Sequence, residues 1–181
     1  GYDIDESTPL DVAALRRQAW MTAFLLERGA DVNRRDKNGA CPLSFAAFSG
    51  DSTVTRMLID AGADLNFRSR QGATLLHAAA LRGQLWLMDL MMGRGEEVDC
   101  ATRAGGAPLH WAARSGQAPA VARPPARGAT PPRGAPSGPA ALQHAVLSNR
   151  PAAARALLAG GAAVNAVDRH GETPLITAAA M

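Results

Sequence analysis

Apolar side chains recur along the chain at a fixed spacing of 33 residues. The clearest series consists of leucines: Leu10, Leu43, Leu76, Leu109, Leu142 and Leu175. Three and four positions after each leucine come two small apolar residues, which are an alanine pair in five of the six places. A constant period of this length is typical of repeat proteins, in which each unit buries its apolar face against its neighbours.

Within each unit, the pattern predicts two helices followed by a loop. Prolines precede four of the leucines, and proline suits a first helical turn because its φ is preset and no N–H is wasted. The first helices are expected to end at left-handed glycines: Gly50, Gly83 and Gly116. Apolar residues with helical spacing, such as Val54, Met57 and Leu58, predict the second helix. That helix is expected to end at a further glycine: Gly29, Gly62, Gly95 or Gly161.

The blocks Gly-Ala-Asp-Val-Asn at 29–33 and Gly-Ala-Asp-Leu-Asn at 62–66 repeat with the same period. Together with the Thr-Pro-Leu and Ala-Ala positions, they resemble the ankyrin repeat over nearly the whole chain. This resemblance implies an all-α solenoid of helix-turn-helix units with β-turn or hairpin-like loops, with about five repeats and a truncated sixth. We expect one domain over 1–181, with units 3–35, 36–68, 69–101, 102–134, 135–167 and 168–181.

Residues 118–141 depart from the pattern. Pro124 and Pro125 stand where other units have apolar pairs such as Leu58-Ile59, and a proline inside a helix costs about 3 kcal/mol or more. We therefore expect this second helix to be shortened or lost and the segment to be a degenerate repeat. The sequence pattern leaves open whether the segment is ordered or disordered. Because the register resumes at Gly138, a decayed repeat and an error in the sequence are alternative explanations. A defective unit would weaken the joint between its neighbours.

Composition narrows the class of protein. The 181 residues are 47% hydrophobic and 4% aromatic, and the formal net charge is +3. Cys41 and Cys100 form no CxxC motif, so we expect free thiols in a reducing compartment, the cytoplasm or alternatively the nucleus. No apolar run approaches the length of a membrane span, so no membrane insertion is expected.

The sequence predicts no catalytic, cofactor-binding or metal site, and hence no enzyme. His77 and His110 occupy the Thr-Pro-Leu-His position, where the resemblance implies hydrogen bonds between adjacent turns. His144, His170 and the cysteines lack the ligand spacing of a zinc site. The resemblance also implies that Asn33, Asn66 and Asn165 bond the loop backbone, and some family members are hydroxylated at such asparagines.

A partner is expected on the concave face, which the resemblance implies is lined by turn tips and first helices. The turn tips also carry Arg35, Arg68, Arg169 and His170. The predicted partner-binding residues are Leu15, Arg16, Lys37, Asn38, Phe48, Arg70, Gln71, Leu81, Arg82, Arg103 and Arg114. This set combines a short apolar ladder with flanking arginines and suits an acidic protein segment with apolar anchors.

The leading prediction is a monomeric protein–protein interaction module without a small-molecule substrate. The alternative is a substrate-recruiting segment of a larger enzyme whose catalytic domain lies outside this chain. Nucleic-acid binding through the arginines is less favoured, because few aromatic side chains are available for base stacking. The three tryptophans, Trp20, Trp86 and Trp111, do not share one repeat position, and we expect them to pack in the core, with a binding platform as the alternative.

Overall fold

The computed structural model describes residues 7–95, 100–104, 106–122, 137–167 and 171–179. Within these residues the chain forms eleven helices and no strand, apart from an isolated antiparallel bridge between Arg68 and Thr74. The all-α class predicted from the sequence is confirmed.

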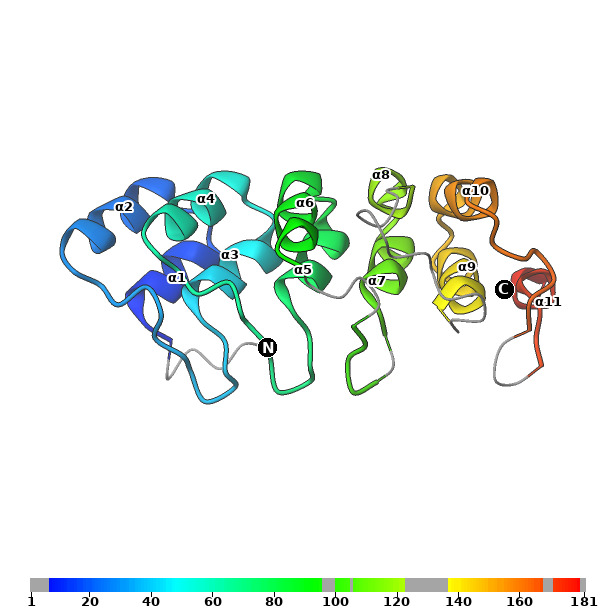
Figure 1. The fold of residues 1–181 in the computed structure, drawn as a ribbon, viewed down its shortest axis with the longest axis horizontal. Coiled ribbons are helices and arrows are strands. Elements are labelled where there is room, and N and C mark those ends of the chain that lie inside the picture. The colour runs from blue at the N-terminus through cyan, green and yellow to red at the C-terminus, as the bar shows by residue number, and fades with distance from the viewer. Residues whose placement is uncertain (1–6, 96–99, 105, 123–136, 168–170, 180–181) are drawn as a thin grey trace.

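The helices form two rows along the molecule (Figure 1). The inner row consists of α1 (Pro9–Leu15), α3 (Pro42–Ser49), α5 (Leu75–Arg82), α7 (Pro108–Ser115), α9 (Ser137–Leu147) and α11 (Pro174–Ala179). The outer row consists of α2 (Ala19–Glu27), α4 (Ser52–Asp60), α6 (Leu85–Gly93), α8 (Ala118–Val121) and α10 (Pro151–Ala159). The loops between units extend from the inner row on the side away from the outer row. The exposed side of the inner row, together with these loops, is called the inner face below.

The inner helices α1, α3, α5 and α7 begin with a local polar motif that the sequence encodes. In α1, Thr8 Oγ1 accepts a hydrogen bond from Asp11 N (3.1 Å), and the Asp11 carboxylate accepts one from Thr8 N (2.8 Å). In α5, His77 is the repeat equivalent of Asp11 and accepts a similar hydrogen bond. Thr74 N donates to His77 Nδ1 at 3.2 Å. Reciprocal bonds of this kind satisfy N–H groups that a helix start leaves without partners.

The predicted left-handed ends of the inner helices are confirmed. Gly50, Gly83 and Gly116 have φ values of 87°, 67° and 79°. Two residues other than glycine adopt the same left-handed backbone conformation at equivalent repeat positions. These are Arg17, with a φ of 59°, and Asn149, with a φ of 51°. A Cβ atom at Gly50 would come within 3.3 Å of the Arg82 side chain, so the glycine also makes room for the neighbouring unit.

The core lies between the two rows and between successive units. Leu10, Leu43, Leu76 and Leu142 are at most 2% exposed. The alanine pairs of units one to four are buried as well, which allows close approach of neighbouring inner helices, whereas the pair in α11 is exposed. Leu175 is 76% exposed although it continues the leucine series, and no second helix follows α11 within the described residues.

The fourth unit has the shortest helix of the outer row. The helix α8 has four residues, whereas each of α2, α4, α6 and α10 has nine. Pro124 and Pro125 lie outside the described residues, as does the rest of segment 123–136. The inner row continues across this unit, because α7 contacts α9 directly, and α8 still contacts α10.

Candidate functional site

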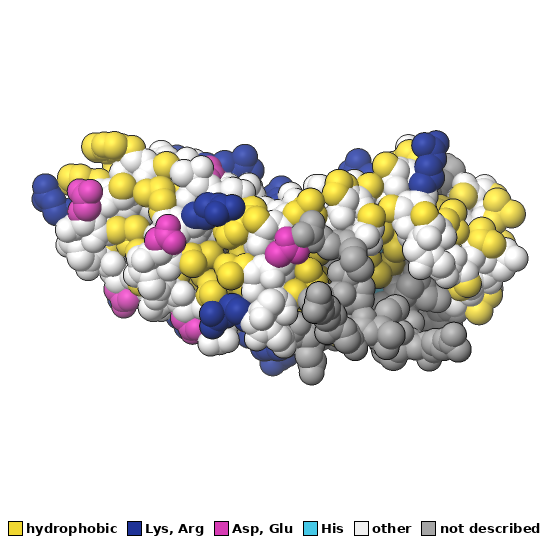
Figure 2. Space-filling view, turned by 45° about the horizontal axis from the view of Figure 1, so that its top comes forward, with side chains coloured by type: hydrophobic (Ala, Val, Ile, Leu, Met, Phe, Trp, Pro, Cys, Tyr) yellow, Lys and Arg dark blue, Asp and Glu magenta, His cyan; other side chains and the backbone are white. Residues whose placement is uncertain are grey.

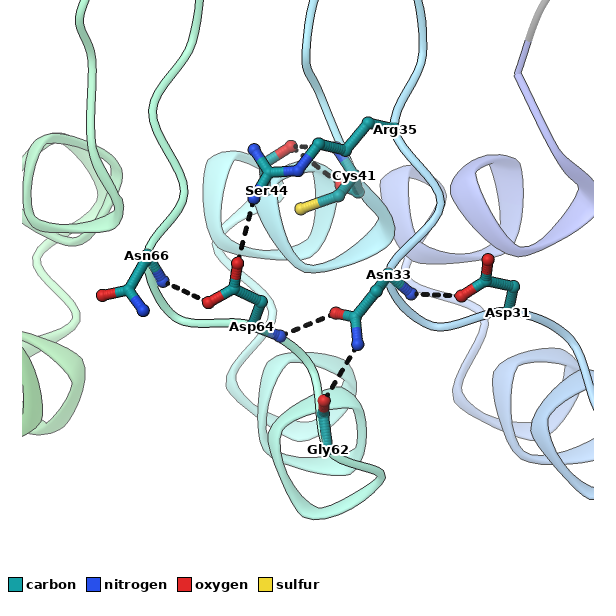
Figure 3. A network of polar contacts seen from close by, with 8 residues as sticks. All are labelled: Asp31, Asn33, Arg35, Cys41, Ser44, Gly62, Asp64 and Asn66. Carbon is teal, nitrogen blue, oxygen red and sulfur yellow. Dashed lines mark hydrogen bonds and ion pairs between the residues drawn. The ribbon is translucent and has the colours of Figure 1, made fainter.

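The loops of neighbouring units are joined by a polar network around Asn33 (Figure 3). Its side-chain nitrogen donates to Gly62 O (3.2 Å), and its side-chain oxygen accepts from Asp64 N (2.7 Å). The carboxylate of Asp64 also forms an ion pair with Arg35 at 3.0 Å. The backbone N–H of Asn66, and then Arg35, lower the pKa of Asp64. The expectation that Asn33 bonds the loop backbone is confirmed, and the bonds cross to the next unit.

His77 holds together two adjacent turns. It is fully buried, its Nδ1 accepts from Thr74 N, and its Nε2 lies 3.0 Å from Gly106 O in the following unit. Because a carbonyl can only accept, Nε2 carries the proton and the ring is neutral. Burial lowers the pKa of His77. Both ring nitrogens are therefore occupied in the hydrogen-bond network that the sequence analysis expected for this position.

An aromatic cluster spans three units along the inner row, with Phe48 and Trp111 half-buried and Phe67 and His77 buried. The ring centroid of Phe48 in α3 lies 6.1 Å from that of Trp111 in α7 and 6.5 Å from that of Phe67. The Trp111 ring in turn meets His77 edge-on at 5.2 Å. The intervening helix α5 carries the small residue Ala78, which is fully buried. A tryptophan in unit four and a phenylalanine in unit two thus meet across unit three.

The predicted apolar ladder lies on the inner helices. Leu15, Phe48 and Leu81 are all half-buried. A further ladder residue, Leu147, was missed by the sequence analysis and is 50% exposed. Leu147 lies one 33-residue period after Arg114, so the repeat spacing alone could have identified it as a ladder residue.

The arginines beside this ladder are exposed, but some of them also connect units. Arg82 Nε donates to the main-chain oxygen of Phe48 at 2.6 Å, and Arg17 donates to that of Ser49. Arg150 Nε lies 3.4 Å from the main-chain oxygen of Arg114. Each of these contacts places a guanidinium against the C-terminal end of a neighbouring inner helix, where cations are favoured. Arg16 and Arg114 are exposed as well.

The remaining predicted residues lie on the loops. Lys37, Asn38, Arg70, Gln71 and Arg103 are exposed. The backbone N–H of Arg103 donates to Gln71 O at 2.8 Å, which joins two successive loops. The additional turn residues Arg35 and Arg68 are also exposed, whereas Arg169 and His170 lie outside the described residues. The predicted partner-binding residues therefore fall into two strips, one along the inner helices and one along the loops.

The expectation that the tryptophans pack in the core is wrong for Trp20. Its side chain is 72% exposed on α2, where it stacks on Phe24 with ring centroids 5.6 Å apart. Trp86 and Trp111 are half-buried. In the part of the chain that the structure describes, no three His, Cys, Asp or Glu side chains gather as metal ligands would. Nor does any helix of these segments have the length and apolarity that crossing a membrane requires.

Two-helix units stacked in a row and joined by bonded loops define an α-helical repeat solenoid. The chain belongs to the ankyrin repeat family: a model of three ankyrin repeats matches residues 43–123, and a single ankyrin repeat matches residues 5–37. Together these matches cover more than half of the 181 residues. A search of curated proteins found no match. Ankyrin repeats are generally protein–protein interaction modules, and domains built from them are typically non-catalytic.

Proposed function

We propose that this protein binds another protein on its inner face, through the two strips of residues on the inner helices and the loops. The observation that carries the proposal is the aromatic contact between Phe48 and Trp111, which joins units two and four. Half-buried apolar side chains that cover several units offer a continuous surface for a partner's apolar anchors. Aromatic residues and arginine are enriched at protein interfaces, and this face combines both.

The charge of this face favours an acidic partner segment. Arg70 and Arg103 on the loops and Arg114 on the inner row are exposed, and Arg114 occupies in unit four the repeat position of Leu81. Complementary charge speeds the encounter of two proteins and selects against wrong partners. An acidic segment with apolar anchors would place its carboxylates on the arginines and its apolar side chains on Phe48, Leu81 and Trp111.

Rigid presentation explains how a repeat stack can bind in this way. The bonds of Asn33 to Gly62 and Asp64 join units one and two, and the bond of His77 to Gly106 joins units three and four. A preformed surface loses little conformational freedom when a partner arrives, so more of the contact energy remains as affinity. We propose that the module acts as a monomer and does not need a cofactor.

Charge reversal on the loops tests this placement of the site. We expect the double variant Arg70→Glu/Arg103→Glu to lose a partner that the wild type retains in affinity capture from cell lysate. The matched control is Arg94→Glu/Arg155→Glu, which makes the same charge change at exposed positions on the outer row. The proposal fails if the loop variant retains the partner, or if both variants lose it equally. Circular dichroism checks that both variants are folded.

The thiols are consistent with the compartment that we propose, the cytoplasm or the nucleus. Cys41 and Cys100 are both buried and neither takes part in a disulfide. Burial raises the pKa of the Cys41 thiol, so this residue stays protonated and unreactive at neutral pH. Reduced structural cysteines are usual in reducing compartments. Fractionation of cells that express the tagged protein would test the assignment.

A further inference from the structure

Acidic residues are distributed unevenly along the stack. Residues 100–167, which cover units four and five, contain no Asp or Glu. The described arginines of this run are Arg103, Arg114, Arg150 and Arg155. Figure 2 shows the same asymmetry, because basic and apolar side chains but no Asp or Glu are visible from α8 to α10. Units four and five therefore carry positive charge that no carboxylate of the same units balances.

The inner helix of unit four presents part of this charge. Arg114 is exposed and follows Trp111 by three residues on α7, so the two side chains lie on the same face of the helix. Burial, and then the charge of Arg114, lower the pKa of His144 on the next inner helix. Arg103 is exposed on the loop that precedes α7. An anionic group on this part of the inner face would therefore meet cations from both the helix and the loop.

The indole N–H of Trp111 offers a hydrogen bond in the same place. No described residue accepts this bond, and the described residues do not fully enclose the indole nitrogen. The indole N–H of Trp86, by contrast, donates to Ser52 Oγ at 3.0 Å. Both tryptophans are half-buried, and a buried indole usually finds an acceptor. The donor of Trp111 is therefore available to a ligand, whereas that of Trp86 is already used.

Gly106 keeps the N–H edge of Trp111 accessible. A Cβ atom at Gly106 would lie 3.1 Å from Trp111 Nε1, which is closer than ordinary van der Waals contact. The same repeat position is occupied by alanine in units two and three, at Ala40 and Ala73. Unit four thus combines an indole donor with a residue that leaves room beside it.

The ring of Trp111 gives this donor an apolar neighbour. Its centroid lies 6.1 Å from that of Phe48, and Leu81 on the intervening helix α5 is half-buried. A ligand that accepts from the N–H and also covers the rings needs an anionic acceptor next to an apolar group. A protein segment with Asp or Glu beside a large apolar residue has both, whereas a nucleic-acid phosphate has no apolar side chain beside it.

We propose that the indole N–H of Trp111 donates to an Asp or Glu side chain of a partner segment, whose neighbouring apolar residue packs on Phe48 and Trp111. This inference rests on the proposed function and deepens it, because it makes Trp111 the residue that distinguishes carboxylates from amides. Arg114 favours the ionised acceptor, and hydrogen bonds to ionised groups are the stronger ones. The acidic part of the partner then lies along units four and five, where no carboxylate of these units repels it.

Selection from a library of random dodecamer peptides supplies the probe. The library is selected on the folded wild-type protein, and only peptides whose binding is weakened by Phe48→Ala are kept, because these bind on the inner face. We expect the kept peptides to contain Asp or Glu beside a large apolar residue. Kept peptides without acidic residues would overturn the inference while the inner face remains a binding surface. If no peptide depends on Phe48, the proposed function fails and the inference fails with it.

A double-mutant cycle then tests the hydrogen bond. The leading peptide, and the same peptide with its Asp or Glu changed to the amide, are titrated into wild type and Trp111→Phe by calorimetry. Trp111→Phe should weaken binding of the acidic peptide about tenfold and that of the amide peptide less, since hydrogen bonds to charged groups contribute on this scale. Gly106→Ala should act in the same direction as Trp111→Phe. Trp86→Phe is the matched control and should bind like wild type. Equal losses for both peptides in Trp111→Phe would overturn the proposal.

Nuclear magnetic resonance detects the bond directly, because the chain has 3 tryptophans and hence few indole N–H signals. The signal of Trp111 is assigned by its absence in Trp111→Phe. The acidic peptide should shift this signal downfield and leave those of Trp20 and Trp86 in place. Saturable binding of the peptide without this shift would overturn the proposal. So would a shift produced by oligodeoxythymidine but not by the peptide, which would assign the donor to a nucleic-acid ligand.

Discussion

The residue that ends each of α3, α5 and α7 must satisfy two structural requirements. Its backbone must be left-handed, and its Cα must lie close to a side chain of the next unit. Glycine meets both demands at Gly50 and Gly116, where the neighbouring side chains are those of Arg82 and Arg150. Asn149 adopts the same backbone conformation, which asparagine tolerates better than most residues.

We predict that Gly50→Ala lowers the free energy of unfolding by about 1–2 kcal/mol, because an L side chain disfavours a left-handed backbone. The φ of 87° at Gly50 lies in this region, and Arg82 would have to move away from the new Cβ. Urea unfolding measures the change. The control Asn149→Gly should alter stability by less than about 0.5 kcal/mol. A Gly50→Ala variant as stable as wild type would contradict the argument.

His77 makes stability depend on pH. Because burial lowers its pKa in the folded protein, the unfolded chain binds protons more readily once the pH falls below about 6.5. Its contribution is therefore complete above that pH and is lost as the pH falls toward the lowered pKa. Burial, together with Arg114, also lowers the pKa of His144, which acts in the same direction.

We predict that the protein is less stable to urea at pH 5.5 than at pH 7.5, and that this difference is smaller in His77→Gln. Titration of the His77 ring proton by NMR should give a pKa below the usual histidine value. A ring that titrates at or above about 6.5 would show that His77 is not held neutral by burial.

At the scale of the element, the outer helices differ in whether a side chain caps their N-terminus. Asp51 caps α4, because its carboxylate accepts from Val54 N at 2.9 Å. The residues at the corresponding place before α2 and α6, Gln18 and Gln84, make no such bond. The helices α2 and α6 also carry one charged residue each, Glu27 and Asp89. They therefore depend more on packing against neighbours than α4 does.

We predict that Asp51→Ala lowers the free energy of unfolding by about 1 kcal/mol, since it removes the cap of α4. Asp51→Ser should retain most of the stability, because a serine hydroxyl can accept the same hydrogen bond. Chemical denaturation of the two variants side by side is the measurement. If both lose stability equally, charge rather than capping is the main contribution of this residue.

At the scale of the whole molecule, the described helices pack mainly within their own unit and against the adjacent units, and the rings of Phe48 and Trp111 additionally meet over α5. The packing of unit four against unit five differs between the inner row and the outer row. In the inner row, α7 contacts α9, whereas in the outer row the four residues of α8 face α10. A linear array in which one interface is reduced can unfold in parts.

We predict two separable transitions in urea. Trp20, Trp86 and Trp111 all lie in units one to four, so their fluorescence reports on that part, whereas circular dichroism reports on all helices. Leu43→Ala should shift the fluorescence transition, and Leu142→Ala should shift only a portion of the dichroism signal. Each removes a buried leucine and costs about 2–5 kcal/mol locally. Coincident transitions by both probes in both variants would show that the stack unfolds as one.

The sequence by itself determined the repeat length, the starts of the inner helices and their left-handed ends. These features depend on interactions within a few residues, such as Thr8 with Asp11, or on the backbone freedom of a single residue such as Gly50. The equivalence of the leucines followed as well, because the same position meets the neighbouring units in each repeat, although Leu175 in α11 is exposed. The inner-face residues on the loops, Arg70 and Arg103, could be placed in the same way.

Only the tertiary structure decided which of the residues at equivalent repeat positions are covered by a neighbouring helix. Trp20 and Trp86 share one position, yet α4 covers Trp86 while Trp20 stands at the end of the row. The meeting of Phe48 with Trp111 likewise depends on how far two side chains reach across Ala78. The hydrogen bond from Arg82 to the Phe48 carbonyl joins residues that are 34 positions apart. A periodic pattern specifies the unit and its neighbours, but burial depends on what lies beyond each face in three dimensions.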